Sequence, residues 1–332
     1  MALTQEQEAM VGVYGQVPHV VNRFFTRRIK KGKIPFLTNM QTINFEVVEE
    51  FARKAKILQR GAEFPKAKLN GSAIKAVTPE VIKDSFPFFA TDELNRQAGM
   101  PVYVNGKKVD NRTYERDRRI AGLKQSIETV QEEISAGVFL KGTYKSPDTG
   151  NEVKYTFATE KQIAKTAVGD DWAIWLTKQV NEFTKNRKVS VSEILVGEKI
   201  FNDIVKSYNA ISNQIVPASV KRVQTEDGDF ELHFNAFGFD LVMIPQISDT
   251  EGKAIDFSDK IMFYNDLAYL PAYAGVTNVV NGIASFEAID VLVRETSADQ
   301  KTGEAETLGE SAYCPLVVNP SLVKIVKITG LS

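Results

Sequence analysis

The side chains that could carry catalysis or bind a metal are few and lie far apart in the sequence. The two histidines are His19 and His233, and the single cysteine is Cys314. A metal site needs several His, Cys or carboxylate ligands at characteristic spacings, and a nucleophilic cysteine needs a histidine in a recognisable context. Neither histidine belongs to such a pattern, and Cys314 stands in the apolar stretch SAYCPLVV, which is typical of a small buried residue. We therefore expect neither a metal site nor a reactive thiol.

Carboxylate pairs and glycine-rich loops give no stronger indication of an enzyme. The sequence contains the carboxylate pairs Asp170–Asp171 and Asp227–Asp229, but they fall at loop or turn positions where acidic residues are expected anyway. The sequence has no G-x-S-x-G elbow and no glycine-rich phosphate-binding loop. We expect no catalytic residue, no cofactor and no enzymatic activity.

The composition describes an ordinary folded protein. The chain has 332 residues, of which 43% are hydrophobic and 25% charged, and its net charge is −1. A balance so close to neutral argues against a dedicated nucleic-acid-binding protein and favours protein partners, including copies of the same chain. The N-terminal stretch lacks the features of a signal peptide, and no apolar run approaches the roughly 20 residues that cross a bilayer. We expect a soluble, non-exported protein with no membrane partner.

The element with the clearest pattern is a helix in the stretch YERDRRIAGLKQSIETVQEEISAGVFLKG, which begins at Tyr114. Its apolar residues recur at spacings of three and four, which places them on one face of a helix. They are Ile120, Leu123, Ile127, Val130 and Ile134. The helix is predicted to end at Ala136, with Gly137 as its C-cap.

The charges of this predicted helix run against its dipole. Basic residues lie near its start and acidic residues near its end, whereas the dipole favours the opposite order. The basic residues are Arg116, Arg118 and Arg119, and the acidic ones are Glu128, Glu132 and Glu133. This arrangement predicts that these side chains find opposite charges in other segments of the chain or in other subunits.

Two stretches before this helix have little capacity to form a core of their own. Residues 1 to about 50 resemble an arm with a basic cluster in RFFTRRIKKGK, which is either a solvated run of charges or a contact with an acidic surface or a phosphate backbone. The stretch from about 51 to 112 is irregular and polar, with Asn105–Gly106 predicting a tight hairpin turn. Such a long excursion needs another surface to lie on.

After the helix the sequence alternates short strands and helices. A hairpin is predicted around residues 147–150, followed by a helix that contains Trp172, Leu176, Val180 and Phe183 and is capped by Asp170 or Asp171. A strand in SEILVG, a helix in EKIFNDIVKSYNAI and a hairpin at Asp227–Gly228 come next. Apolar strands are predicted in FGFDLVMIP, DKIMFYN and the alternating tail SLVKIVKIT. The fold class is therefore α+β.

The order of these motifs resembles the major capsid proteins of tailed bacteriophages, in the group typified by the phage lambda head protein (capsid protein E). The stretches that carry the resemblance are RTYERDRRIAGLKQSIETVQEEISAGVFLKGTY, ILVGEKIFNDIVKS, FGFDLVMIPQ, KIMFYND and YCPLVVNPSLVKIVKI. Each motif is weak alone, but their order and spacing extend over most of the chain. The resemblance implies the HK97-type capsid fold, with an N-terminal arm, an extended E-loop, a peripheral domain built on a long spine helix, and an axial domain.

On this resemblance the chain divides into five parts. They are the arm (1–54), the E-loop (55–112), the peripheral domain with its spine helix (113–186), the axial domain (187–309) and a C-terminal strand returning to the peripheral domain (310–332). The arm and E-loop would lie on neighbouring subunits, whose interfaces supply the burial that these segments lack.

The resemblance implies a capsid subunit that forms pentamers and hexamers of one chain, which build an icosahedral shell around double-stranded DNA. The alternative is an encapsulin-like nanocompartment shell. Decoration, scaffold and portal proteins are implied partners, DNA would be contacted non-specifically, and the protein would be found in the virion after assembly in the host cytoplasm. We expect charged residues of the arm, E-loop and spine helix to make contacts between subunits. These candidates are Arg27, Arg28, Lys30, Lys31, Lys66, Lys68, Arg116, Arg118, Arg119, Glu132 and Glu133.

Overall fold

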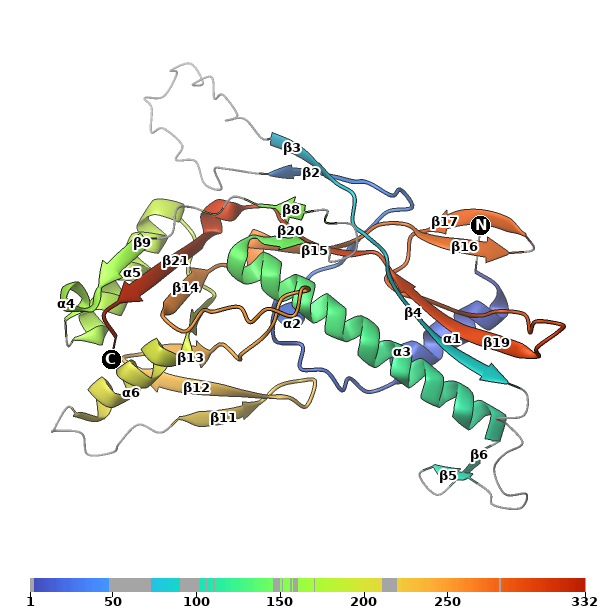
Figure 1. Ribbon diagram of the computed structural model, residues 1–332. Helices are drawn as coiled ribbons and strands as arrows, with labels where there is room; N and C mark the ends of the chain where they lie inside the picture. Colours follow the sequence, from blue (N-terminus) through green and yellow to red (C-terminus); the bar gives the residue numbers. More distant parts are fainter. Residues whose placement is uncertain are drawn as a thin grey trace, which may run out of the picture. The chain divides into compact units, whose positions relative to one another are not determined.

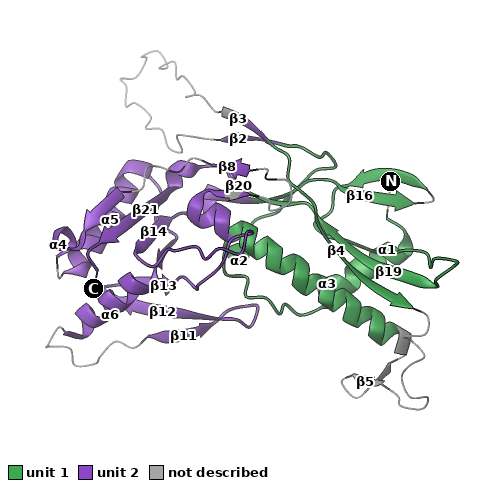
Figure 2. Cartoon of the chain, viewed as in Figure 1, with its two compact units in different colours: residues 1–43, 77–135, 271–315 green, residues 44–76, 136–270, 316–332 purple. Residues whose placement is uncertain are grey.

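The computed structural model describes most of the chain, and its contacts divide the chain into two units (Figure 2). The described residues are 3–47, 73–89, 102–104, 107–109, 111–145, 150, 152–155, 157, 161–169, 171–210, 220–280 and 282–331. Unit 1 combines residues 1–43, 77–135 and 271–315, and unit 2 combines residues 44–76, 136–270 and 316–332.

Unit 1 is built around the long helix α3 (Asn111–Ala136), which confirms the helix predicted from the apolar stripe. Ile120, Leu123 and Ile127 are fully buried, Ile134 is buried and Val130 is half-buried. The buried stripe packs against helix α1 (Gln5–Gln16) and against the strand region at residues 291–293. Helix α2 (Phe24–Lys30) completes the helices of this unit.

The predicted last residue of α3, Ala136, is confirmed, but the predicted C-cap at Gly137 is wrong. The helical backbone passes through Gly137 and continues as a π-helical turn, Gly137–Lys141, whose C-cap is Gly142 with a φ of 70°. Val138, Phe139 and Leu140 are buried in this extra turn, and their burial stabilises the additional backbone that a cap at Gly137 would have excluded. Gly142 is required at the cap, because a Cβ there would lie 2.7 Å from the carbonyl oxygen of Tyr155.

A three-stranded sheet of unit 1, in the order β18-β19-β4, packs against α3 (Figure 1). Strand β4 (Ile82–Phe89) pairs along its whole length with β19 (Glu304–Ser311), and β18 (Leu292–Glu295) pairs with the other edge of β19. Gly122 and Gly309 provide the room for this packing. A Cβ on Gly122 would lie 2.7 Å from the Phe86 ring, and one on Gly309 would lie 2.9 Å from Ile127.

Unit 2 contains a seven-stranded sheet in the order β11-β12-β13-β10-β14-β21-β9. Helices α5 (Trp172–Arg187) and α6 (Glu198–Ala210) cover one face, since their apolar residues share a core with alternate residues of the strands. Asp171 caps α5 by accepting a hydrogen bond from the Ile174 amide at 3.1 Å, as predicted. The strands are β9 (Lys161–Ala164), β10 (Glu193–Val196), β11 (Lys221–Gln224), β12 (Phe230–Ala236), β13 (Phe239–Met243), β14 (Lys260–Tyr264) and β21 (Val323–Thr329).

Smaller sheets account for the remaining strands. The predicted hairpins are confirmed by the pairs β5–β6, β7–β8 and β11–β12, although Asn105–Gly106 and most of the turn at 147–150 lie outside the described residues. The remaining sheets are β1-β15-β20, β2-β3 and the hairpin β16–β17. These strands are β1 (Phe36–Leu37), β2 (Ile43–Val47), β3 (Ala73–Val77), β5 (Val102–Val104), β6 (Lys107–Val109), β7 (Thr143–Lys145), β8 (Glu152–Lys154), β15 (Tyr269–Tyr273), β16 (Val276–Val280), β17 (Ile283–Glu287) and β20 (Tyr313–Val317). Short helical turns are α4 (Lys165–Val168), η2 (Asp266–Ala268) and η3 (Pro320–Leu322).

Within the described part of the chain, no helix combines the length and the apolar character needed to cross a membrane.

Candidate functional site: charged contacts of helix α3

Helix α3 carries a row of buried charged residues at a spacing of four. Lys124, Glu128 and Glu132 are 3%, 6% and 4% exposed, so each lies almost wholly out of water. Residues four apart lie above one another on a helix, and a buried charge is tolerated only with hydrogen-bonding or ionic partners. All three find these partners in the N-terminal segment of unit 1.

Glu132 binds the beginning of α2. Its carboxylate accepts hydrogen bonds from the amides of Phe25 at 2.7 Å and Thr26 at 2.9 Å. The first amides of a helix have no partner within the helix, and Arg23 at the N-cap of α2 provides no side-chain cap. Glu132 therefore supplies from α3 the cap that α2 lacks. Burial raises the pKa of Glu132, and the two amide hydrogen bonds oppose that rise.

Lys124 and Glu128 hold the rest of the segment. The Lys124 ammonium donates hydrogen bonds to the carbonyl oxygens of Tyr14 at 3.0 Å and Val17 at 2.5 Å, at the end of α1. The Glu128 carboxylate lies 2.7 Å from His19 Nδ1 and 3.7 Å from Arg23. The row thus engages the end of α1, the following linker and the start of α2, and it fixes residues 14–26 along α3.

The predicted contact residues on α2 differ in exposure. Arg28 is 5% exposed, donates to the Phe24 carbonyl oxygen at 3.0 Å and places its guanidinium carbon 3.7 Å from the Phe24 ring centroid. Arg27 is half-buried, whereas Lys31 at the C-cap of α2 is exposed. Of these three, Lys31 therefore has the most accessible charge.

Lys30 lies over two tyrosine rings. Its ammonium is 5.6 Å from the ring centroid of Tyr273 and 5.5 Å from that of Tyr313, and these two rings are 5.2 Å apart. A cation over an aromatic face is stabilised by the ring quadrupole. Burial, and then the nearby charge of Arg23, lowers the pKa of Lys30 to about 8.

The arginines at the start of α3 also differ from one another. Arg119 donates to Thr307 Oγ1 at 3.0 Å, lies 3.5 Å from Glu295 and stacks 3.8 Å from the Phe88 ring centroid. Arg116 is half-buried with its nearest acidic contact at 4.0 Å, whereas Arg118 is exposed and 3.9 Å from Glu115. Arg118 is thus the most accessible of the three.

The remaining predicted residues add little to this picture. Glu133 is half-buried on α3, and Lys66 and Lys68 lie outside the described residues. Lys124 was not predicted to have a role, whereas Glu128 was expected to find an opposite charge in another segment and does so at His19 and Arg23. The spacing of four places Lys124, Glu128 and Glu132 on one side of the helix, but the sequence carries no signal that this side is buried.

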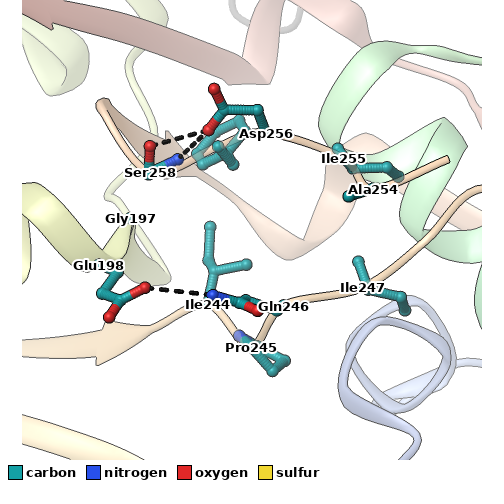
Figure 3. A pocket seen from close by; sticks show the side chains of 11 residues that line it. Gly197, Glu198, Ile244, Pro245, Gln246, Ile247, Ala254, Ile255, Asp256 and Ser258 are labelled. Carbon is teal, nitrogen blue, oxygen red and sulfur yellow. Dashed lines mark hydrogen bonds between the residues drawn. The ribbon is translucent and has the colours of Figure 1, made fainter.

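A cavity of about 280 Å³ lies in unit 2 at the start of α6 (Figure 3). It is lined by Gly197, Glu198 and residues 244–247 and 254–258. Its polar groups bind one another, since Gln246 donates to Glu198 at 3.4 Å and the Ser258 hydroxyl and amide both donate to Asp256. The polar side chains of the cavity whose hydrogen bonds the structure describes are therefore already paired with one another.

The described residues contain no group of three or more His, Cys, Asp or Glu that could hold a metal ion. His233 instead lies between two carboxylates, 2.8 Å from Asp240 and 3.2 Å from Glu231. Cys314 is fully buried, as its apolar context predicts.

Comparison with known proteins identifies the fold. No protein-family model matches the sequence, and no curated protein matches it. The structure is similar to a prophage protein of Escherichia coli CFT073 that is described as a capsid protein, with a TM-score of 0.62 and 13% identity over 99% of this chain and 100% of that chain. It also matches a chain of Gordonia phage Cozz (TM-score 0.49, 11% identity, 93% of this chain and 87% of that one). A third match is the SrpI encapsulin complex of Synechococcus elongatus PCC 7942 (TM-score 0.43, 11% identity, 98% and 96%).

The chain therefore has the HK97-type fold of phage capsid proteins, as the sequence resemblance implied.

Proposed function

We propose that the chain is a major capsid protein that assembles into pentamers and hexamers, and that these form an icosahedral shell around double-stranded DNA. The observation that carries the proposal is the full-length structural similarity to the prophage capsid protein, which spans 99% of this chain and 100% of that one. The order of the sequence motifs supports a finer assignment to the group typified by the lambda head protein. The role is structural, without enzymatic activity.

We assign the five predicted parts accordingly. Residues 1–54 form the arm, 55–112 the E-loop, 113–186 the peripheral domain, 187–309 the axial domain and 310–332 the returning strand. Assembly takes place in the host cytoplasm and the product is the virion shell, with scaffold, portal and decoration proteins as further partners.

Contacts between copies use charged side chains that remain accessible in the single chain. Among the described candidates, Lys31 and Arg118 are exposed, whereas Arg28 and Glu132 are buried against partners in their own unit. Lys66 and Lys68 of the E-loop remain predicted contact residues.

The proposal is tested by expressing the chain alone and with the other head genes of its phage, and by examining the purified protein by electron microscopy and light scattering. Icosahedral particles of megadalton mass containing nuclease-protected DNA are expected from the complete set of head proteins. Shells that enclose a cargo protein and no DNA would favour the encapsulin-like alternative. A discrete monomer or small oligomer under all these conditions would refute a shell-forming function.

A further inference from the structure

Three cations lie around Glu182 in unit 2, one at the end of α5 and one each at the beginnings of β9 and β21. They are Lys161, Arg187 and Lys324, here called the α5 cation cluster. We propose that this cluster binds phosphate groups of a nucleic-acid backbone. The inference rests on the proposed function, because a shell around a genome brings DNA to the surface of its subunits.

The strand register places both lysines on the side of the sheet that α5 covers. Lys161 is paired with Val326, and Lys324 lies two residues before Val326 on the same face of β21. Val326 belongs to the core shared with α5, so Lys161 and Lys324 continue that face beyond the apolar core. Lys161 is exposed, whereas the side chain of Lys324 is only 11% exposed.

Arg187 is the last residue of α5. Contacts with Phe183 and Ser321 fix the position of its guanidinium, and its two terminal nitrogens donate to no described acceptor. Its guanidinium carbon lies 4.4 Å from the Phe183 ring centroid, and its Nε donates to the carbonyl oxygen of Ser321. Neither of its terminal nitrogens donates a hydrogen bond to a residue that the structure describes. A guanidinium fixed in this way offers two parallel N–H donors, the geometry that recognises phosphate in a bidentate manner.

The charges of the cluster are not balanced by the described residues around them. Glu182 is its carboxylate and lies 2.9 Å from Lys324, and this hydrogen bond, with the charges of Lys324, Lys161 and Arg187, lowers the pKa of Glu182. Burial lowers the pKa of Lys324, and the positive charges of Arg187 and Lys161 lower it further. One carboxylate among three cations leaves an excess of two positive charges.

Exposed lysines at the end of α5 increase this excess. Lys185 and Lys188 lie beside Arg187 in the last turn and at the C-cap. The helix dipole favours cations at the C-terminal end of α5, which accounts for Arg187 and its neighbouring lysines. It does not account for Lys161 of β9 and Lys324 of β21.

The surroundings of the cluster favour a phosphate backbone over an acidic protein. The exposed large apolar side chain of α5 is Ile174, which lies more than three turns before Arg187. A protein interface generally has an apolar centre, whereas contact with a nucleic-acid backbone needs only cations and hydrogen-bond donors.

The test measures binding of a fluorescent DNA duplex of about 20 base pairs to the full-length, unassembled protein by anisotropy between 50 and 200 mM salt, the range over which phosphate contacts weaken strongly. The double variant K161Q/R187Q should bind more weakly, and its slope of log K against log salt should be shallower by about 1.8, since each phosphate contact contributes about 0.9. R187K retains the positive charge but lacks the two parallel N–H donors of the guanidinium, so it should bind DNA with intermediate affinity. K206Q removes an exposed lysine from α6 of the same unit and should leave both affinity and slope unchanged.

Binding by K161Q/R187Q with wild-type affinity and slope would overturn the inference, as would tighter binding of poly-glutamate than of DNA by the wild type. Because Arg187 also contacts Phe183 and Ser321, circular dichroism must show a folded variant. The pair K161Q/K185Q removes exposed charges alone, so it keeps the test decisive if R187Q misfolds. Electron microscopy of the wild type separates the two proposals. If the wild type forms shells and K161Q/R187Q binds DNA as the wild type does, the cluster does not bind phosphate. If the wild type forms no shells, the proposed function is refuted.

Discussion

Removal of the Glu132 carboxylate should release α2 from α3. In the Glu132→Ala variant the amides of Phe25 and Thr26 lose their acceptor while they remain buried. A buried donor left without a partner costs about 1–3 kcal/mol, so two of them predict a local destabilisation of about 3 kcal/mol after partial relaxation. Since 1.4 kcal/mol corresponds to a factor of ten, opening of α2 should become about 100-fold more frequent.

The Glu132→Gln variant separates the hydrogen bonds from the charge. The Gln side chain retains one carbonyl acceptor and leaves one buried amide without a partner, so its local cost should be about half that of the Ala variant, roughly 1.5 kcal/mol. Burial raises the pKa of Glu132, which means that the folded protein binds its proton more tightly than the unfolded chain does. The stability that Glu132 contributes relative to Gln is therefore greatest below the ordinary carboxyl pKa and is lost as the pH rises through the raised value. Lowering the pH from 7 to 4 should shift the difference in favour of the wild type.

Hydrogen–deuterium exchange of peptides that cover residues 24–30 measures this opening directly. The matched control is Gln125→Ala, an exposed substitution on the same helix, which should leave the exchange of α2 unchanged. If Glu132→Ala changes exchange of the α2 peptides less than twofold, Glu132 does not hold the start of α2 and the proposed anchoring is wrong.

Three further predictions concern contacts inside unit 1 or inside unit 2. Lys124→Met leaves two carbonyl oxygens at the end of α1 without their donor and should lower the free energy of unfolding by about 2 kcal/mol, seen as faster exchange of α1 amides. Gly197→Ala places a Cβ against the backbone of Phe257 and should destabilise unit 2 by more than about 3 kcal/mol in a denaturant titration followed by tryptophan fluorescence, whereas Gly12→Ala, with open space around it, should be neutral or stabilising. Arg119→Glu should destabilise the monomer in thermal unfolding by circular dichroism, whereas exposed Arg118→Glu should leave the monomer folded and reduce particle yield; equal melting losses would contradict this distinction.

Patterns within one element allowed correct predictions of α3, α5, α6 and several strands, although α1, α2 and many of the other strands were not predicted. The apolar stripe of α3 and the alternation of β21 depend on local periodicity, which is why both were found. The C-cap was placed wrongly at Gly137 because glycine is a common capping residue, and only burial of the following turn shows that the helical backbone continues as a π-helical turn. A glycine can mark a cap or a close approach, and its sequence neighbours do not distinguish the two.

Contacts between distant segments could not be predicted in the same way. The pairing of β4 with β19 joins Ile82 to Ser311, and nothing in the irregular stretch around β4 indicates this partner. The burial of Lys124, Glu128 and Glu132 could not be predicted either, because charged residues at a spacing of four usually lie on a solvent-exposed helix face. Their burial depends on the N-terminal segment that covers them, which lies more than 100 residues away.

The charge order of α3 now has a physical explanation within unit 1. Arg119 lies in the first half of α3 and Glu132 in its second half, so both oppose the dipole of the helix, although its effect is weak outside the terminal turns. Arg119 is compensated by Glu295 and Thr307, and Glu132 by the positive end of α2, whose dipole favours a carboxylate at that position. Arg119 and Glu132 are therefore satisfied by other elements of the same unit and need no second copy of the chain. We propose that the exposed Arg118 and Lys31 contact other subunits and that the α5 cation cluster contacts phosphate.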